Sequence, residues 1–467
     1  MRIISVLLCL LALAPASAQQ SYIIDWDEVG EEAVQHLVQL VRLDTTNPPG
    51  NETRVVEYLE RVLADEGMAA ERYALDPERA NLVVRKRGNG SKRPVLLMGH
   101  TDVVGVQPEK WYGDPFSGKR EDGFIYGRGT LDDKDNLAAS LMVMMLLDRY
   151  GVELDRDVIF LAEAGEEGTP EVGINFMVEN HFEVIDAEYA LAEGGQNIMH
   201  DDKVAQVGIE TTEKMPRRVT LLARGTPGHG SKPTLENAVV ILANAITKAA
   251  AWETEVRLND TTRTYFRRLA EISAPEEAYR YLNVENEELS DEIQQYFLES
   301  FPYHYSISRT SVVPTVIDAG FRRNVIPSEA SAILDIRMLP DQDVEKFYEQ
   351  LAAVIDDPRV EIIPERIYRP AAPPSDIDNE MFRVLENVAL RMYPGSTVLP
   401  IMQTGATDMA QIRARGVQAY GIGPARSIEE INSGFGAHGD NERVEERAFI
   451  DMVRYMWNVV IEVAATR

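Results

Sequence analysis

The chain has 467 residues, of which 45% are hydrophobic and 26% charged. This is the composition of an ordinary globular protein, and the length is sufficient for two domains. The 76 acidic residues outnumber the 47 basic ones and give a formal net charge of −29. Because so acidic a surface repels nucleic acid and anionic lipid, we exclude both as partners.

Residues 1–18 have the pattern of a secretory signal peptide. A short basic start precedes an apolar run at 3–14 and small residues at 16–18. We therefore expect cleavage after Ala18 and export to the periplasm or the medium. A membrane anchor is the alternative, but the apolar run is too short to span a bilayer. The single cysteine, Cys9, lies in this segment, so the mature chain would have no thiol and no disulfide.

The first part of the mature chain, residues 19–212, alternates helical patterns with apolar strands. The spacing of apolar residues predicts an α/β sheet with helices on its faces. The expected helices are 31–42, 53–66 and 136–150, and the expected strands are 80–84, 94–98, 158–162 and 189–192.

A second pattern runs from 213 to 368 and predicts a smaller α+β domain of the β-α-β-β-α-β kind. Its expected strands are 218–223, 330–338 and 359–363, and its expected helices are 237–252 and 344–355. An acidic, tyrosine-rich insert at 253–306 enlarges it. The proline-rich segment 369–374 marks its end. Residues 369–467, with helices at 379–393 and from about 444, return to the first pattern, so we expect a catalytic domain interrupted by the smaller one.

Residue types that bind metals follow the apolar runs. In open α/β sheets, ligands bind beyond the carboxyl ends of the strands. His100 follows one expected strand, and Asp102 could accept a hydrogen bond from the ring nitrogen that does not bind metal. A buried histidine with no metal is the alternative. Asp132 and Asp133 precede the helix at 136–150, where an aspartate can cap the helix or bridge two cations.

Two more expected strands end in carboxylates. Glu166 and Glu167 follow the strand at 158–162, where isolated buried charge would be costly. One of them could bind metal while its neighbour acts as general base. Glu193 follows another strand, and His438 precedes the last helix. Two histidines and three carboxylates suit a pair of zinc ions.

The order of these motifs resembles the co-catalytic zinc metallopeptidase family. That family includes aminoacylase, bacterial glutamate carboxypeptidase, acetylornithine deacetylase and succinyl-diaminopimelate desuccinylase. The resemblance covers essentially the whole mature chain, and the enlarged middle domain and export signal are most similar to the carboxypeptidase S and secreted N-acyl-amino-acid hydrolase branch. It implies a catalytic domain with a mixed sheet flanked by helices, an inserted lid and dimerisation domain, and two Zn²⁺ ions that Co²⁺ or Mn²⁺ could replace.

The resemblance also implies roles for individual residues. In the catalytic domain these are His100 and Glu193 on one zinc, His438 and Glu167 on the other, Asp132 as the bridge with a cis Asp132–Asp133 peptide, Glu166 as general base and Asp102 as the partner of His100. In the lid, His229 would polarise the scissile carbonyl, in related dimers from the neighbouring subunit. Asn324, Arg337 and Gly405 correspond to substrate-binding positions. For Arg337, a surface salt bridge of the lid is the alternative.

Three positions depart from the family pattern. Asp135 stands where glycine usually follows the Asp-Asp-Lys run, which could alter the start of the helix. Gly165 replaces an acidic residue before the glutamate pair, with Glu163 further back. Ala410 stands where many relatives carry an arginine, which puts the family's grip on a substrate carboxylate in question.

These observations predict a metal-dependent hydrolase that cleaves amide or peptide bonds of small substrates, as a metallocarboxypeptidase or dipeptidase. The alternative is an aminoacylase-like N-acyl-amino-acid amidohydrolase, and a more remote one is a catalytically silent zinc- or peptide-binding homologue. The absence of a Gly-x-Ser-x-Gly motif and of a mature cysteine argues against a serine or cysteine hydrolase. The lid could form a homodimer, or the insert could replace a partner's contacts in a monomer.

Overall fold

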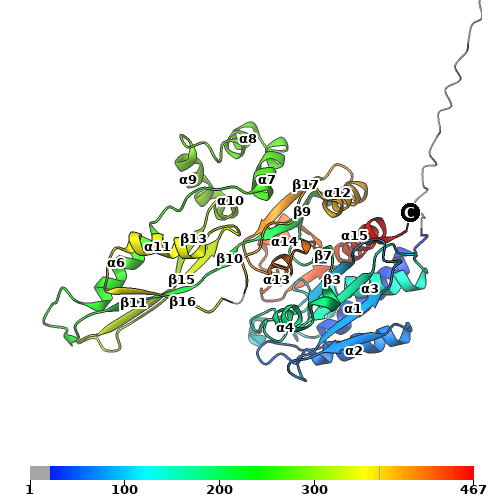
Figure 1. Ribbon diagram of the computed structural model, residues 1–467, viewed down its shortest axis with the longest axis horizontal. Coiled ribbons are helices and arrows are strands. Elements are labelled where there is room, and N and C mark those ends of the chain that lie inside the picture. Colours follow the sequence, from blue (N-terminus) through cyan, green and yellow to red (C-terminus); the bar gives the residue numbers. More distant parts are fainter. Residues whose placement is uncertain (1–21, 368, 467) are drawn as a thin grey trace, which may run out of the picture.

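The computed structural model describes residues 22–367 and 369–466. The expected signal peptide, including Cys9, lies outside the described residues. Figure 1 shows a large body built around one sheet and, beside it, an elongated unit built around a second sheet. Among the described helices, none is both long and apolar enough to cross a membrane.

The large body contains a ten-stranded sheet with both parallel and antiparallel pairs. The strand order along the sheet is β1 (Ala70–Tyr73), β2 (Asn81–Lys86), β6 (Val158–Glu163), β3 (Val95–His100), β7 (Tyr189–Ala192), β18 (Gln418–Gly421), β9 (Lys203–Glu213), β8 (Gln196–His200) and β19 (Ala425–Ser427), with β17 (Thr397–Gln403) paired to β9. The central strands β3, β6 and β7 run parallel to one another. Their carboxyl ends therefore meet at one edge of the sheet.

Helices cover both faces of this sheet. One face carries α1 (Trp26–Val41), α2 (Thr53–Asp65), α3 (Lys134–Arg149), α12 (Glu380–Met392) and α15 (Glu446–Ala464). The other carries α4 (Ile174–Asn180), α5 (Phe182–Ile185) and α13 (Met409–Arg413). Because successive strand residues point to opposite faces, Leu97 joins the first cluster and Leu96 the second.

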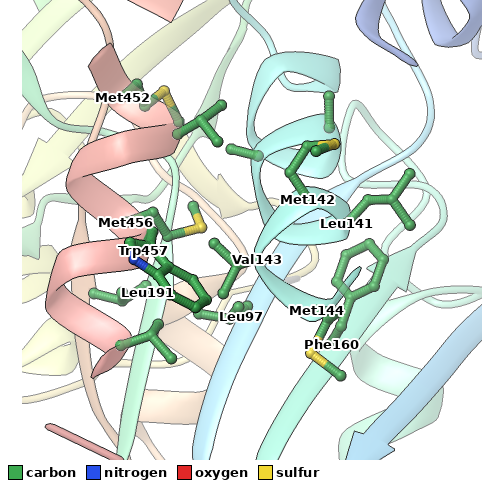
Figure 2. Packing of buried hydrophobic residues seen from close by; sticks show 14 of the residues in the cluster. Leu97, Leu141, Met142, Val143, Met144, Phe160, Leu191, Met452, Met456 and Trp457 are labelled. Carbon is green, nitrogen blue, oxygen red and sulfur yellow. The ribbon is translucent and has the colours of Figure 1, made fainter. Parts of the chain in front are cut away.

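The core of the large body lies between the sheet and the helices α3 and α15. Figure 2 shows Met142 and Val143 of α3 beside Met456 and Trp457 of α15, above Leu97 of the sheet. All five side chains are almost fully buried. Strands and helices buried on all sides read as continuous apolar runs, which is why the sequence predicts them well.

The elongated unit contains a five-stranded antiparallel sheet. Its strands are β10 (Met215–Pro216), β15 (Glu329–Met338), β11 (Val219–Arg224) and β16 (Val360–Pro364) in that order, with β13 (Ser311–Ala319) paired to β15. Two helices pack on one face: α6 (Ala238–Ala250) and α11 (Val344–Ile355). The prediction of an α/β fold with a mixed sheet and a smaller α+β unit is confirmed. The domain limits stay a prediction.

The acidic insert forms four helices: α7 (Asp260–Glu271), α8 (Pro275–Leu282), α9 (Ser290–Ser300) and α10 (Pro302–Ser308). Their apolar side chains share a cluster with Leu399, Ile401 and Met402 of β17. Buried Lys214 donates hydrogen bonds of 2.7 Å to the carbonyls of Ser306 and Arg309. The insert therefore packs against the large body. Lys214, directly after β9, also binds the end of the insert through these hydrogen bonds.

The remaining elements are short. They are η1 (Pro108–Lys110), α14 (Ile428–Asn432), the two-stranded sheet of β12 (Gly228–His229) and β14 (Val325–Ile326), and the three-stranded sheet of β20 (Arg443–Glu445), β5 (Phe124–Tyr126) and β4 (Lys119–Glu121).

Candidate metal centre

Three neighbouring strands bring candidate ligands to one edge of the large sheet. His100 is the last residue of β3, Glu166 and Glu167 follow β6, and Glu193 follows β7. Asp132 comes from the turn before α3. His438 comes from the loop before β20 and has a left-handed φ of 64°. The structure thus gathers at this edge all five residues predicted as metal ligands.

The five side chains form two groups that share one aspartate. His100, Asp132 and Glu193 make one group, and Asp132, Glu167 and His438 make the other, with the ligand atoms of each group within 4.8 Å of one another. His100 Nε2 lies 2.9 Å from Asp132 Oδ1, and His438 Nε2 lies 3.0 Å from Asp132 Oδ2. Each oxygen of Asp132 thus faces a different histidine. This is the arrangement expected of a carboxylate that bridges two cations.

The charge of the cluster also fits cations. Burial raises the pKa of Glu193, and the nearby carboxylates of Asp133 and Asp132 raise it further. Burial likewise raises the pKa of Glu166 to about 8, against the opposing effect of Arg369. Carboxylates crowded in this way gain from a nearby divalent charge. Imidazole nitrogen together with carboxylate oxygen suits zinc, and also cobalt or manganese. The residues present therefore fit a pair of metal ions.

Asp102 contacts residues of both ligand groups, His100 in one and Glu167 in the other. Its carbonyl oxygen lies 3.0 Å from His100 Nδ1, and its Oδ1 lies 3.4 Å from the same nitrogen. Its carboxylate accepts hydrogen bonds from the backbone amides of Glu166 (3.0 Å) and Glu167 (3.1 Å), and from Asn47 Nδ2 (2.7 Å). The side chain is fully buried. Asp102 thus contacts the ring of His100 and the backbone of the glutamate pair, a position from which it can orient both.

Arg369, which the sequence analysis did not single out, holds the side chain of Glu166 and is itself held by Asp408. Arg369 Nη2 donates to Glu166 Oε1, and Arg369 Nη1 donates to Asp408 Oδ1 at 2.9 Å. Glu166 itself is buried. Arg369 opens the segment predicted as a linker, and Asp408 lies in the Gly405–Ala410 motif without an assigned role. No pattern in the sequence connects these positions to Glu166.

A cavity of about 490 Å³ opens onto the cluster from the elongated unit. We call it the arginine cavity because five arginines line it: Arg217, Arg218, Arg337, Arg366 and Arg369. Gly405 also lines it, so two of the predicted substrate-binding residues, Arg337 and Gly405, lie at the site. Arg337 Nε also donates to Asp335 Oδ1 at 2.6 Å. The salt bridge considered as the alternative is therefore present as well.

The structure does not bring His229 and Asn324 to the cluster. His229 pairs with Val325 in the small two-stranded sheet. Its ring is exposed, with Nδ1 2.7 Å from Ser231 Oγ. Gly230 N donates to the carbonyl of Asn324, so the two predicted residues lie near each other. Neither of them lines the arginine cavity. Their catalytic and substrate-binding roles stay predictions.

The structure shows how the chain accommodates two of the departures from the family pattern, those at Asp135 and Gly165. Asp133 precedes α3, but its carboxylate accepts from the amide of His100 (3.1 Å) and caps no helix amide. Asp135 is buried in the first turn of α3, which begins at Lys134 despite the substitution. Gly165 has a φ of +79°, and a Cβ there would lie 2.4 Å from the carbonyl of Thr169. Only glycine fits that turn. The Asp132–Asp133 peptide bond is cis, as predicted.

This fold, with paired metal-ligand groups at the strand ends, defines a metal-dependent hydrolase. Residues 96–462 match the peptidase family M20/M25/M40, and the chain belongs to this family. The prediction of a co-catalytic metallopeptidase relative is confirmed. Membership supports an enzyme that hydrolyses amide bonds.

Relatives of known name agree with this. The chain is 31% identical over 328 residues to the probable carboxypeptidase S-like 2 of Dictyostelium discoideum, a match that covers 68% of this chain and 62% of that protein. It is 26% identical over 446 residues to the human N-fatty-acyl-amino acid synthase/hydrolase PM20D1, covering 92% and 87%. The M20 metallo-carboxypeptidase Sso-CP2 from Sulfolobus solfataricus has a TM-score of 0.68 at 19% identity, covering 92% and 98%. The last likeness shows the fold alone.

Proposed function

We propose that the chain is a two-zinc hydrolase that cleaves the amide bond next to a residue with a free carboxylate. The observation that carries the proposal is the position of Asp132, whose two oxygens face His100 and His438 in two separate ligand groups. The main candidate activity is that of a metallocarboxypeptidase or dipeptidase. The relative named as carboxypeptidase S-like supports it.

The positions of the residues support the roles proposed for them. When bound, a zinc pair supplies Lewis-acid charge and lowers the pKa of water toward neutrality. Glu166 lies in the same cluster, within 4.8 Å of His100 and Glu167. Its carboxylate would take the proton of the attacking water and return it to the leaving amine. Arg369 fixes the orientation of that carboxylate, and Asp102 fixes the loop that carries it.

The arginine cavity supports recognition of a carboxylate. Arg369 is already balanced by Glu166 and Asp408. Arg217 differs, because its side chain is buried and its guanidinium forms no ion pair within the described part of the chain. Its Nη1 donates to the carbonyl of Pro216 and its Nη2 to the weakly accepting sulfur of Met215 at 3.7 Å, while its Nε has no hydrogen-bond partner among the described residues. Burial lowers the pKa of Arg217 because the charged form loses its hydration. A substrate carboxylate beside the guanidinium would offset that loss.

Hydrolysis of N-acyl amino acids is the second candidate. Its substrates also carry a free carboxylate on the amine side of the scissile bond, so the same cavity would receive them. The human relative is named as an N-fatty-acyl-amino acid synthase/hydrolase, and the match covers most of both chains. The two candidates differ in what lies on the acyl side.

The test is hydrolysis by the zinc-loaded protein of a panel of dipeptides, N-acetyl amino acids and long-chain N-acyl amino acids. A chelated sample and a Glu166→Gln variant serve as negative controls. Hydrolysis that both controls abolish, and that added zinc restores to the chelated sample, supports the proposal. Unchanged hydrolysis in the chelated sample contradicts it. Zinc binding without hydrolysis of any compound favours the silent-binder alternative.

A homodimer through the elongated unit is part of the proposal. The edge strand β13 and the turn after it expose Val313, Val316, Ile317 and Phe321. His229 lies outside the arginine cavity of its own chain. A second copy could therefore supply it. Mixing inactive Glu166→Gln chains with inactive His229→Ala chains tests this, because activity returns only if His229 acts on the neighbouring subunit. Sedimentation of the parent as a monomer would contradict the dimer.

Export after cleavage at Ala18 remains a proposal that rests on the sequence pattern of residues 1–18. Mass spectrometry of the protein recovered from the cell exterior and the cytoplasm tests it. A mature chain that begins at Gln19 outside the cytoplasm is the expected result. Retention of the full chain in the cytoplasm would contradict it.

A further inference from the structure

A second cavity, of about 440 Å³, also opens onto the metal centre. It shares Asp132, Glu193 and Gln403 with the arginine cavity, so the two cavities meet at the cluster. We call it the apolar cavity because much of its wall is hydrocarbon. The side chains that give it this character are Leu131, Ile198, Ile422, Ile431, Tyr265 and Tyr303. Its size lies within the ordinary range of small-molecule sites.

The insert supplies part of this wall. Tyr265 comes from α7 and Tyr303 from α10. The hydroxyl of Tyr303 donates to the carbonyl of Met402 at 3.1 Å, and the hydroxyl of Tyr265 lies 3.0 Å from His304 Nε2. Since partners within the protein engage both hydroxyls, the tyrosines offer the cavity mainly ring carbon. The packing of the insert on β17 holds them there.

The polar groups of the wall do not favour a substrate carboxylate. Asp133 and Asp135 lie at the metal end and are both buried. Asn197 Nδ2 already donates to the carbonyl of Gly423 at 2.7 Å. Arg426, the cation of this wall, donates through Nη2 to the carbonyl of Glu430 at 3.1 Å. Unlike Arg217, it has two carboxylates near it, those of Glu430 and Glu442, which oppose the lowering of its pKa by burial. The carboxylate end of the substrate is therefore better placed in the arginine cavity. The part of the substrate on the other side of the scissile bond would then occupy the apolar cavity.

We propose that the apolar cavity binds the acyl side of the substrate and selects a long hydrocarbon chain, so that the preferred substrates are N-acyl amino acids with extended apolar acyl groups. This inference rests on the proposed amide hydrolysis and chooses between its two candidates. It also gives the insert a function, which is to close the cavity over the chain with Tyr265 and Tyr303.

The short helix α14 offers a matched pair of positions for a test. Ile431 lines the apolar cavity and is 44% exposed. Ile428, on the same helix, is 48% exposed and does not line the cavity. Because both side chains are partly in solvent, aspartate is tolerated at either position without a buried unpaired charge. Only Ile431→Asp places a carboxylate against the acyl chain.

The experiment uses one amino acid carrying linear acyl groups from acetyl to dodecanoyl. For the zinc-loaded parent we expect kcat/KM to rise by about fourfold for each added methylene until the cavity is filled. Ile431→Asp should lower the ratio of dodecanoyl to acetyl kcat/KM at least tenfold. Ile428→Asp should leave that ratio unchanged. Binding of the same compounds to zinc-loaded Glu166→Gln, measured by calorimetry, should follow the same order.

The outcomes separate this inference from the proposed function. Hydrolysis that does not depend on chain length, or that is fastest for dipeptides, overturns the acyl site and leaves amide hydrolysis standing. An equal effect of the two aspartate variants also overturns it. Binding to Glu166→Gln that strengthens with chain length, in a protein that hydrolyses nothing, supports the acyl site and overturns the proposed function.

Discussion

The guanidinium of Arg369 donates a hydrogen bond to the carboxylate of Glu166, a residue 203 positions earlier in the chain. Its other Nη reaches Asp408 at 2.9 Å. Arg369 lies just after β16, the last strand of the elongated unit, whereas Glu166 follows β6 of the large body. The segment that re-enters the large body therefore positions the proposed general base. Any displacement of that segment would also move the carboxylate.

Replacement of the base should abolish turnover without unfolding the protein. We expect Glu166→Gln to lower kcat by at least about 10²–10⁴-fold, because the amide keeps the shape of the side chain but cannot accept the proton. Metal content by mass spectrometry should stay at the parental value. Glu179→Gln, on α4, is the matched control and should keep parental kcat. Near-normal turnover in Glu166→Gln would show that another group is the base.

Replacement of Arg369 should reduce turnover less than replacement of Glu166 does. Arg369→Met removes a charged hydrogen bond to a buried carboxylate, an interaction worth roughly 10–100-fold. We expect kcat to fall by about that factor, with partial recovery in Arg369→Lys, which keeps the charge but not the two-pronged geometry. A change confined to KM would mean that Arg369 contacts the substrate and does not position Glu166.

Asp102 should control metal affinity. Asp102→Asn keeps the side-chain volume but loses the negative charge beside His100 and replaces one acceptor of the Glu166 and Glu167 amides with a donor. Groups that orient metal ligands typically contribute 10–100-fold in affinity. Competition for zinc against a coloured chelator should show a loss of that size. Asp114→Asn, in an exposed turn, is the control and should bind zinc as the parent does.

Four of the five metal ligands have a local signal in the sequence because they lie at the end of an apolar run or directly before a helix, whereas His438 lies in the loop before β20. His100, Glu167 and Glu193 stand at or just after the ends of buried strands, so a short continuous apolar run followed by a polar residue locates them. Arg369, Asp408 and Asn47 have no such local signal. They reach the site only because segments far apart in the chain pack together. The spacing of apolar and polar residues does not predict that packing.

The packing of the insert at residues 253–306 also could not be predicted from the sequence. Its acidic, tyrosine-rich composition marked residues 253–306 as an addition, but the helices α7–α10 pack against β17, a strand that the sequence analysis did not predict. Pro400 lies inside that strand and weakens its strand pattern. For His229 and Asn324, the motif located the residues in the elongated unit but could not say that they lie outside the arginine cavity of the same chain.

The insert should lose stability in acid because of one buried histidine. His304 is 6% exposed and lies among the rings of Phe266, Tyr281 and Phe297, and its Nδ1 has no hydrogen-bond partner among the described residues. Burial lowers its pKa to about 4. An unfolded histidine titrates near 6.5, so between these two values the unfolded chain binds more protons than the folded one.

The sign of the effect follows from that difference. The stability that neutral His304 provides is complete above about pH 6.5 and is lost as the pH falls toward 4, reaching a deficit of about 2 kcal/mol at pH 5. His304→Gln keeps an acceptor for the Tyr265 hydroxyl but does not titrate. We expect urea unfolding of the parent to weaken by about 2 kcal/mol more than that of His304→Gln between pH 7 and pH 5. Exposed His200→Gln should behave as the parent. If parent and His304→Gln weaken equally, the acid sensitivity arises elsewhere, and the histidines of the metal centre become the groups to test.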